Sequence, residues 1–198
     1  MDRTVPTLQG RWVRLEPLRA EHAKDLWDAA REREIWRYMT FDVASPSDLD
    51  AWIAMRLADA RDHGALVFVQ RDARTGQAFG STSIFDLRPK DKGVEIGHTW
   101  IGASHRGTPA NTEAKLLLLT HGFEALGAIR VQLKTDARNA RSRAAIERLG
   151  AQFEGILRHH SIMPDGYRRD TAMYSILAAE WPGVKARLQE SLARPRGA

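Results

Sequence analysis

The stretch HRGTPANTEAKLLLLTHGF, residues 105–123, changes from a basic turn into an apolar helix within a few positions. Arg106, Gly107 and Pro109 belong to its first half, and the leucines of its second half predict a helix from about Thr112 to Leu126. The first N–H groups of a helix have no partner inside it and therefore favour an anion. The stretch indicates an anion site, or else a loop that Gly107 and Pro109 merely interrupt.

Strand and helix patterns continue on both sides of this stretch. Period-two alternation predicts strands at residues 11–18, 65–72, 77–87, 92–102, 129–135, 151–163 and 167–177. Helical spacing and cap residues predict helices at residues 19–39, 45–64, 139–150 and 180–193. Together they predict one α+β domain over residues 1–198, with its core at about 11–181 and a mostly antiparallel sheet.

The composition is that of an ordinary globular domain, and it excludes several kinds of site. A chain of 198 residues is long enough for one well-buried core. It has no cysteine, which excludes disulfides, thiolate metal sites and a cysteine nucleophile. We find neither a signal-peptide pattern nor an apolar run of membrane-spanning length, so we expect no membrane partner and a cytoplasmic location.

The net charge of +5 favours an acidic partner, such as nucleic acid, an acidic protein or a phosphorylated cofactor. Most arginines alternate with acidic residues, as in AREREIWR, and this pattern is typical of a solvated helix face. The chain has no patch in which aromatic residues interleave with basic ones. We therefore do not expect a nucleic-acid partner.

Residues 139–155, NARSRAAIERLGAQFEG, complete an ordered set of motifs with the opening stretch. The set resembles the acetyl-CoA-binding core of the GNAT N-acetyltransferases, and most closely the RimJ/RimL type, which acetylates amino groups. In that family a loop of the form Q/R-x-x-G-x-G/A precedes a long helix that commonly continues Thr-Glu-Ala. Arg106 and the run from Thr112 to Ala114 match this form, whereas Pro109 and Asn111 replace its small residues. Pro109 has no N–H to offer an anion.

The resemblance covers the chain from about Arg11 to Trp181 and implies the GNAT fold, in which the sheet is splayed at the acetyl-CoA cleft and flanked by helices. The strand EIGHTWI is similar to the family strand that grips the pantetheine arm of the cofactor. The resemblance implies cofactor contacts from the end of this strand, the loop and the second helix start. These residues are Trp100, Ile101, Arg106, Gly107, Thr108, Ala110, Asn111, Thr112, Asn139 and Arg143.

Transfer of an acetyl group from a thioester to an amine requires a base for the amine, donors for the developing oxyanion and a proton for the leaving thiolate. Glu95 is our first choice as the base, His98 the second and His160 the third. Alternation places His98 on the opposite face from Glu95, so both reach one site only if a bulge intervenes. Glu95 could equally be a strand residue bonded to a neighbour.

The acid is expected in the helix that follows residues 129–135. Ser142 lies in its first turn, and in RimL-like enzymes the serine at this position is the proposed acid, although such a serine is usually only solvated. Asn139 is expected to cap this helix and, by the resemblance, to reach the cofactor as well. Arg138, Arg141 and Arg143 surround Asn139, and one or two of them are expected to meet the CoA phosphates, with Arg143 as the one that we assign. Arginine is also common on a short exposed helix.

The sequence thus predicts direct acetyl transfer from acetyl-CoA to a primary amine, which is either a protein N-terminus or a small amine. The alternative is a non-catalytic GNAT-like domain that senses acyl-CoA or binds RNA. Trp36, Tyr38 and Phe41 are expected to wall the acceptor side, unless they are core residues. No metal site is expected, because the adjacent His159 and His160 point to opposite faces of a strand. A homodimer is left open.

Overall fold

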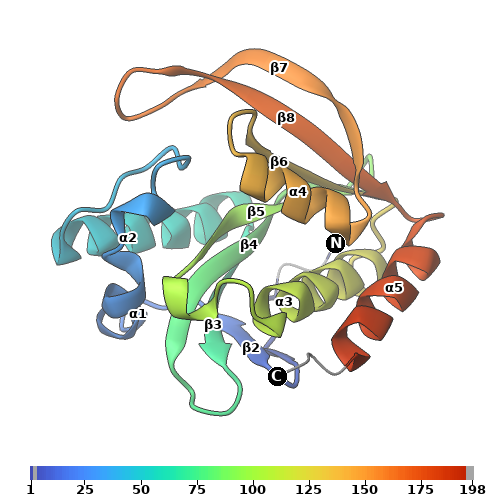
Figure 1. Cartoon of the computed structure of the whole chain (residues 1–198), viewed down its shortest axis with the longest axis horizontal. Coiled ribbons are helices and arrows are strands. Elements are labelled where there is room, and N and C mark those ends of the chain that lie inside the picture. Colours follow the sequence, from blue (N-terminus) through green and yellow to red (C-terminus); the bar gives the residue numbers. More distant parts are fainter. Residues whose placement is uncertain (2–3, 195–198) are drawn as a thin grey trace.

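The computed structural model describes residues 1 and 4–194 (Figure 1). In this part of the chain, eight strands form one sheet in the order β1-β2-β3-β4-β5-β6-β8-β7. Only β5 and β6 are parallel neighbours, so the predicted, mostly antiparallel α+β fold is confirmed. The strands are β1 (Leu8–Gln9), β2 (Val13–Pro17), β3 (Leu66–Asp72), β4 (Ala78–Arg88), β5 (Gly93–Ile101), β6 (Arg130–Asp136), β7 (Gln152–Ile162) and β8 (Arg168–Leu177).

Helices cover both faces of the sheet (Figure 1). The first two pack on one face, and the other three pack on the opposite face over the larger core. Within the described residues, no helix is both long and apolar enough to cross a membrane. The helices are α1 (His22–Ala30), α2 (Pro46–His63), α3 (Pro109–Thr120), α4 (Ala140–Leu149) and α5 (Trp181–Ala193).

The helix predicted over residues 19–39 is shorter than expected. It ends at Ala30, and only a short 3-10 turn, Arg33–Ile35, follows it. Trp36 explains the stop, because its indole N–H donates to the carbonyl of Ala30, one of the groups that a helix end leaves without a partner. Trp36 is 3% exposed and packs with Trp52 and Trp100, so it belongs to the core and the expectation that it walls the acceptor side is wrong.

The helix predicted from about Thr112 begins three residues earlier, at Pro109. Thr108 is the N-cap, and Pro109 takes the first helical position, where its fixed φ fits and its missing N–H would have no helical partner. The helix continues to Thr120 and then into a π-helical turn, His121–Ala125. The helix start that could bind an anion in residues 105–123 therefore lies at Thr108 and Pro109.

The parallel pair in the middle of the sheet is short. The register of β5 with β6 runs only from Gly93 opposite Arg130 to Glu95 opposite Gln132. Beyond Glu95 the two strands separate, while β6 stays paired with β8 as far as Asp136. The expected splay of the sheet is confirmed, and it opens toward the carboxyl ends of β5 and β6.

Candidate active site

Glu95 and His98 lie on the same face of β5, although they are three residues apart. Phe85 on β4 is directly opposite Glu95, so their side chains share a face, and the ring of His98 packs on Phe85 with centroids 4.3 Å apart. A bulge causes this, because a step of two residues along β4, from Ser81 to Ser83, is matched by a step of three along β5, from Trp100 to Gly97. His98 takes a positive φ of 49° at the bulge. Because the bulge lies between them, Glu95 and His98 can both face one site.

The carboxylate of Glu95 is buried and held from β6. Its Oε2 accepts hydrogen bonds from Nε2 of Gln132 at 2.7 Å and from Nζ of Lys134 at 3.1 Å. Its Oε1 is buried and has no hydrogen-bond partner among the described residues. Glu95 is therefore bonded to neighbouring strand residues, which was the alternative to a role as the base, but the bonds use only one of its two oxygens. The second oxygen remains able to accept a proton.

His98 is neutral over the physiological pH range. Burial, followed by the positive charges of Arg56, Lys134 and Arg169, lowers the pKa of His98 to about 3. His160, the third candidate base, lies in the same environment, where burial and the charges of Lys134 and Arg169 lower its pKa. The Nδ1 of His160 is 3.2 Å from the hydroxyl of Thr171. All three candidate bases therefore lie in one positively charged region on the α1–α2 side of the sheet.

The loop before α3 is fixed by its own side chains. The hydroxyl of Thr108 donates to the carbonyl of His105 at 2.8 Å and accepts from the N–H of Ala110 at 3.3 Å. Arg106 donates to the carbonyl of Ile101 at 3.1 Å and forms an ion pair with Glu32 at 3.5 Å. These bonds fasten the first turn of α3 to the end of β5, with Asn111 and Thr112 half-buried in that turn.

Gly107 has a positive φ of 74°, which suits glycine and turns the loop toward α3. Pro109 occupies the helix position where an N–H is least needed, so the cost of the variant loop is one missing donor for a ligand rather than a weakened helix. Of the two predicted strand-end contacts, Ile101 is half-buried at the cleft, whereas the side chain of Trp100 is committed to the core. Trp100 can therefore offer a ligand its backbone but not its ring.

The start of α4 follows β6 directly. The Oδ1 of Asn139 accepts from the N–H of Ser142 at 3.0 Å, which confirms the predicted cap. Arg143 donates to the hydroxyl of Tyr174 at 3.0 Å, and its guanidinium lies 5.6 Å from the ring centroid of Phe153. Arg143 is therefore already bound within the fold, and a role toward a phosphate would require it to change partners.

Lys115 is a residue near the cleft that our sequence analysis missed. It is buried on α3, and its ammonium donates to the hydroxyl of Thr99 on β5 at 2.7 Å. Burial lowers the pKa of Lys115 to about 7. A lysine within the apolar run TEAKLLLL was the signal that could have revealed it.

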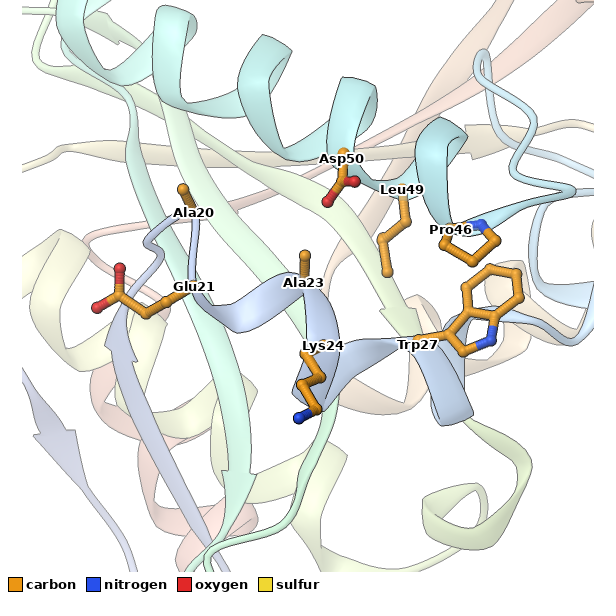
Figure 2. Close-up of a pocket in the computed structure, with 8 residues that line it drawn as sticks. All are labelled: Ala20, Glu21, Ala23, Lys24, Trp27, Pro46, Leu49 and Asp50. Atoms are coloured by element: carbon orange, nitrogen blue, oxygen red, sulfur yellow. The ribbon is translucent and has the colours of Figure 1, made fainter.

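A hollow between α1 and α2 lies away from these residues (Figure 2). None of its lining residues is a predicted site residue. They are Ala20, Glu21, Ala23, Lys24, Trp27, Pro46, Leu49 and Asp50. The predicted site residues lie instead where β5 and β6 separate. There, α3 and α4 begin after the carboxyl ends of these two parallel strands, an arrangement that commonly binds ligands.

This arrangement is that of a known family. The family model described as "Acetyltransferase (GNAT) domain" matches residues 13–152. The chain therefore belongs to the GNAT family of N-acetyltransferases, as its resemblance implied. A relative from Bacillus subtilis (strain 168), named "Putative ribosomal N-acetyltransferase YdaF", is 30% identical over 173 residues, which cover 86% of this chain and 92% of the relative.

Solved structures agree with this assignment. A GCN5-related N-acetyltransferase from Brucella melitensis is 32% identical, with a TM-score of 0.88, covering 96% of this chain and 86% of that one. The structure of Mycobacterium smegmatis RimJ in complex with CoA-disulfide is 24% identical, with a TM-score of 0.77 and coverage of 94% and 93%. At this identity the likeness to RimJ concerns the fold. GNAT enzymes use acyl-CoA as the donor, so the cleft between β5 and β6 belongs to an acyl-CoA-dependent enzyme.

Proposed function

We propose that this chain is a single catalytic domain that transfers an acetyl group from acetyl-CoA directly to a primary amine. The observation that carries the proposal is the buried carboxylate of Glu95, with one oxygen bonded and one without a partner among the described residues, beside the opening between β5 and β6. A domain that only sensed acyl-CoA would have no need of a buried base there. This favours catalysis over the non-catalytic alternative.

The residues at the two helix starts fit a diphosphate-bearing thioester. The loop from Arg106 to Thr112 would hold the diphosphate with the N–H groups of the first turn of α3, and Pro109 is the one position there without a donor. Asn139 would contact the cofactor with the amide N–H₂, because its Oδ1 already caps α4. The RimJ structure with CoA-disulfide supports a CoA compound in this fold.

The proposed chemistry starts from an amine that is mostly protonated at neutral pH, since alkyl amines have a pKa of about 10. Glu95 accepts the proton from the amine through its Oε1, directly or through water, while Gln132 and Lys134 hold its Oε2. The neutral amine attacks the thioester carbonyl, so that a C–N bond forms and the C–S bond breaks. The hydroxyl of Ser142 supplies a proton to the departing sulfur, and the proton that the nitrogen loses as it becomes an amide restores that hydroxyl. CoA brings the activated acyl group, so the chain needs no nucleophile of its own.

The acceptor is a primary amine of a protein N-terminus or a small molecule. The name of the Bacillus subtilis relative supports a ribosomal protein N-terminus as one member of this class. Tyr38 and Phe41, which lie between α1 and α2, remain the proposed walls of the acceptor side.

Two measurements test the proposal. Acetyl-CoA should raise the melting temperature of the protein, because a ligand that binds only the folded state stabilises it. Thiol release from acetyl-CoA should then depend on an added amine, drawn from a panel of amino acids, polyamines and peptides with unblocked N-termini. If saturating acetyl-CoA shifted the melting temperature but no amine in the panel released thiol, the sensing alternative would replace our proposal.

A further inference from the structure

Arg169, near the start of β8, is a buried cation whose nearby carboxylates, Asp136 and Glu95, act on it without forming an ion pair. The residue is 7% exposed, and its Nε is buried without a hydrogen-bond partner. Among the described residues, Arg169 has one hydrogen bond, from its Nη1 to the carbonyl of Tyr38, and at 3.5 Å this bond is long. Across residues 1 and 4–194, Arg169 forms no ion pair. A buried guanidinium nitrogen whose N–H has no acceptor costs the fold free energy.

The face of the sheet on which Arg169 lies follows from the strand register. Alternate residues of β8, Ala172, Tyr174 and Ile176, belong to the core under α3, α4 and α5, so Arg169 and Thr171 point to the opposite face. That opposite face is the one that carries Glu95 and His98. Figure 1 shows the β7–β8 hairpin extending toward the side occupied by α1 and α2, where Arg169 reaches Tyr38.

The other cations of this region are already neutralised. Arg56 is paired with Asp59, Lys134 with Glu95 at 3.1 Å, and Arg138 with Asp136 at 2.8 Å. Three cations are thus paired directly with three carboxylates. Arg169 shares the charges of Asp136 and Glu95 with Arg138 and Lys134 but forms no ion pair of its own among the described residues. Its charge reaches His98 and His160, whose pKa values it helps to lower, so it acts where the acceptor amine would lie.

We propose that Arg169 binds an anionic group, a carboxylate, on the acceptor, so that the acceptor class is an amine that also carries a carboxylate. This inference rests on the proposed function for the identity of the acceptor side. A carboxylate matches the planar donor edge of a guanidinium and would use the Nε that is now without a partner. The cofactor does not account for Arg169, because the helix starts that would hold its phosphates follow the ends of β5 and β6.

The first test compares matched amines with wild-type enzyme and Arg169→Gln. Glycine, β-alanine and γ-aminobutyrate vary the distance between amine and carboxylate, and the amide of each removes the charge. We expect Arg169→Gln to lower kcat/KM for a carboxylate-bearing amine by about 10- to 100-fold, because one charge-assisted interaction is lost. Its amide should be unaffected. Arg168→Gln, on the exposed neighbour of Arg169, is the matched control.

A peptide arm distinguishes two sources of the carboxylate. Amide-capped dipeptides with aspartate or asparagine in second place present the same charge on a side chain. Preference for the free amino acids assigns the carboxylate to an α-carboxyl group or its equivalent, and preference for the aspartate peptide assigns it to an acidic side chain. The inference would be overturned if kcat/KM were equal for the amino acids and their amides and for the aspartate and asparagine peptides, and if Arg169→Gln lowered all of these values equally.

A binding measurement separates this inference from the proposed function. Calorimetry compares N-acetylglycine and N-acetyl-β-alanine with their amides, in the presence of CoA, on wild type and Arg169→Gln. If the acids bind only to wild type while no amine is acetylated, the carboxylate site stands and the proposed function fails. If amines are acetylated but acids and amides bind alike, the function stands and the carboxylate site fails.

The melting temperature of Arg169→Met distinguishes a ligand-binding arginine from one that stabilises the fold. An unpaired buried cation is costly, so Arg169→Met should raise the melting temperature or leave it unchanged. An arginine that held the hairpin in place would instead lower it on replacement. A marked loss of stability in Arg169→Met, with no change in acid binding, would overturn the proposal.

Discussion

The ammonium of Lys134 on β6 lies 3.1 Å from Oε2 of Glu95 on β5. The pair joins the two strands at the point where their register ends, since Glu95 is the last residue of β5 paired with β6. Glu95 is almost fully buried, whereas the side chain of Lys134 is 31% exposed. The half-exposed lysine therefore offsets the cost of keeping a carboxylate charged in the interior, and it does so at the mouth of the cleft.

Glu95→Gln should lower kcat by about 100-fold or more, because an amide cannot accept the proton from the amine. The affinity for acetyl-CoA should change little, since Glu95 faces the α1–α2 side of the sheet. Steady-state rates with the best amine and a cofactor titration measure both quantities. Glu190→Gln, at an exposed position of α5, is the control. A normal kcat in Glu95→Gln would remove Glu95 as the base and leave His98 and His160.

Ser142→Ala should lower kcat by about 100-fold with unchanged cofactor affinity, because the hydroxyl acts only when the thiolate leaves. The cap at the start of α4 survives, since Asn139 accepts from the backbone N–H of residue 142 and not from its side chain. Rates should be compared with those of Ser191→Ala, an exposed serine on α5. Turnover at the wild-type rate would end the role of Ser142 as the acid.

Two variants of Asn139 separate its cap from its contact with the cofactor. Asn139→Ala should lose about 1 kcal/mol of unfolding free energy, whereas Asn139→Ser should keep most of it because serine also caps helices. If the amide binds the cofactor, both variants weaken acetyl-CoA affinity to a similar degree. Urea unfolding and a cofactor titration on each variant supply the data, and unchanged affinity in Asn139→Ser would leave only the cap.

Acid should destabilise the protein through His98. The folded chain protonates His98 only near pH 3, whereas the unfolded chain does so near pH 6.5. Between these values the unfolded state binds more protons, so stability falls as the pH drops from 6.5. From pH 7 to pH 5 the loss is on the order of 2 kcal/mol for this one group.

His98→Gln should therefore lose less stability than wild type when urea unfolding is repeated at pH 7 and pH 5. His63→Gln, at the exposed end of α2, should follow wild type. Parallel losses in His98→Gln and wild type would mean that His98 is not held neutral in the fold.

Alkali should stabilise the protein through Lys115. The folded chain releases this proton near pH 7 and the unfolded chain near pH 10.5, so between them the unfolded state binds more protons. The free energy of unfolding should therefore rise with pH across this window. Lys115→Met should be more stable than wild type at pH 7 and should flatten the rise, whereas the exposed Lys90→Met should do neither. Identical pH profiles for Lys115→Met and wild type would contradict the assignment.

Local signals accounted for most of the secondary structure. The cap of α2 needs only Ser45 and Asp48, which bond to each other's backbone, and Gly64 ends the same helix with a positive φ of 70°. The cap of α4 likewise involves residues only three apart. Such contacts are complete within a few residues of chain, and so the printed sequence was sufficient to predict them.

Two errors in the helices have different causes. Pro109 was assigned to a turn, although proline is equally suited to the first position of a helix, and local sequence does not distinguish these uses. The early end of α1 depends on Trp36 turning back to the carbonyl of Ala30 and packing on Trp52 and Trp100. That packing brings together residues from distant parts of the chain, so no local pattern contains it.

The sequence by itself determined the order of the strands and helices along the chain and the glycine and cap positions that end them, because these depend on contacts between near neighbours. It also determined the family, because the motifs of the family can be read directly from the residues. Only the tertiary structure decided that Glu95 and His98 share a face, since the bulge exists only where β5 is paired with β4. It also decided that Lys115 and Arg169 are buried. The charge that a side chain carries in the interior depends on what surrounds it, and those surroundings come from elements far away along the chain.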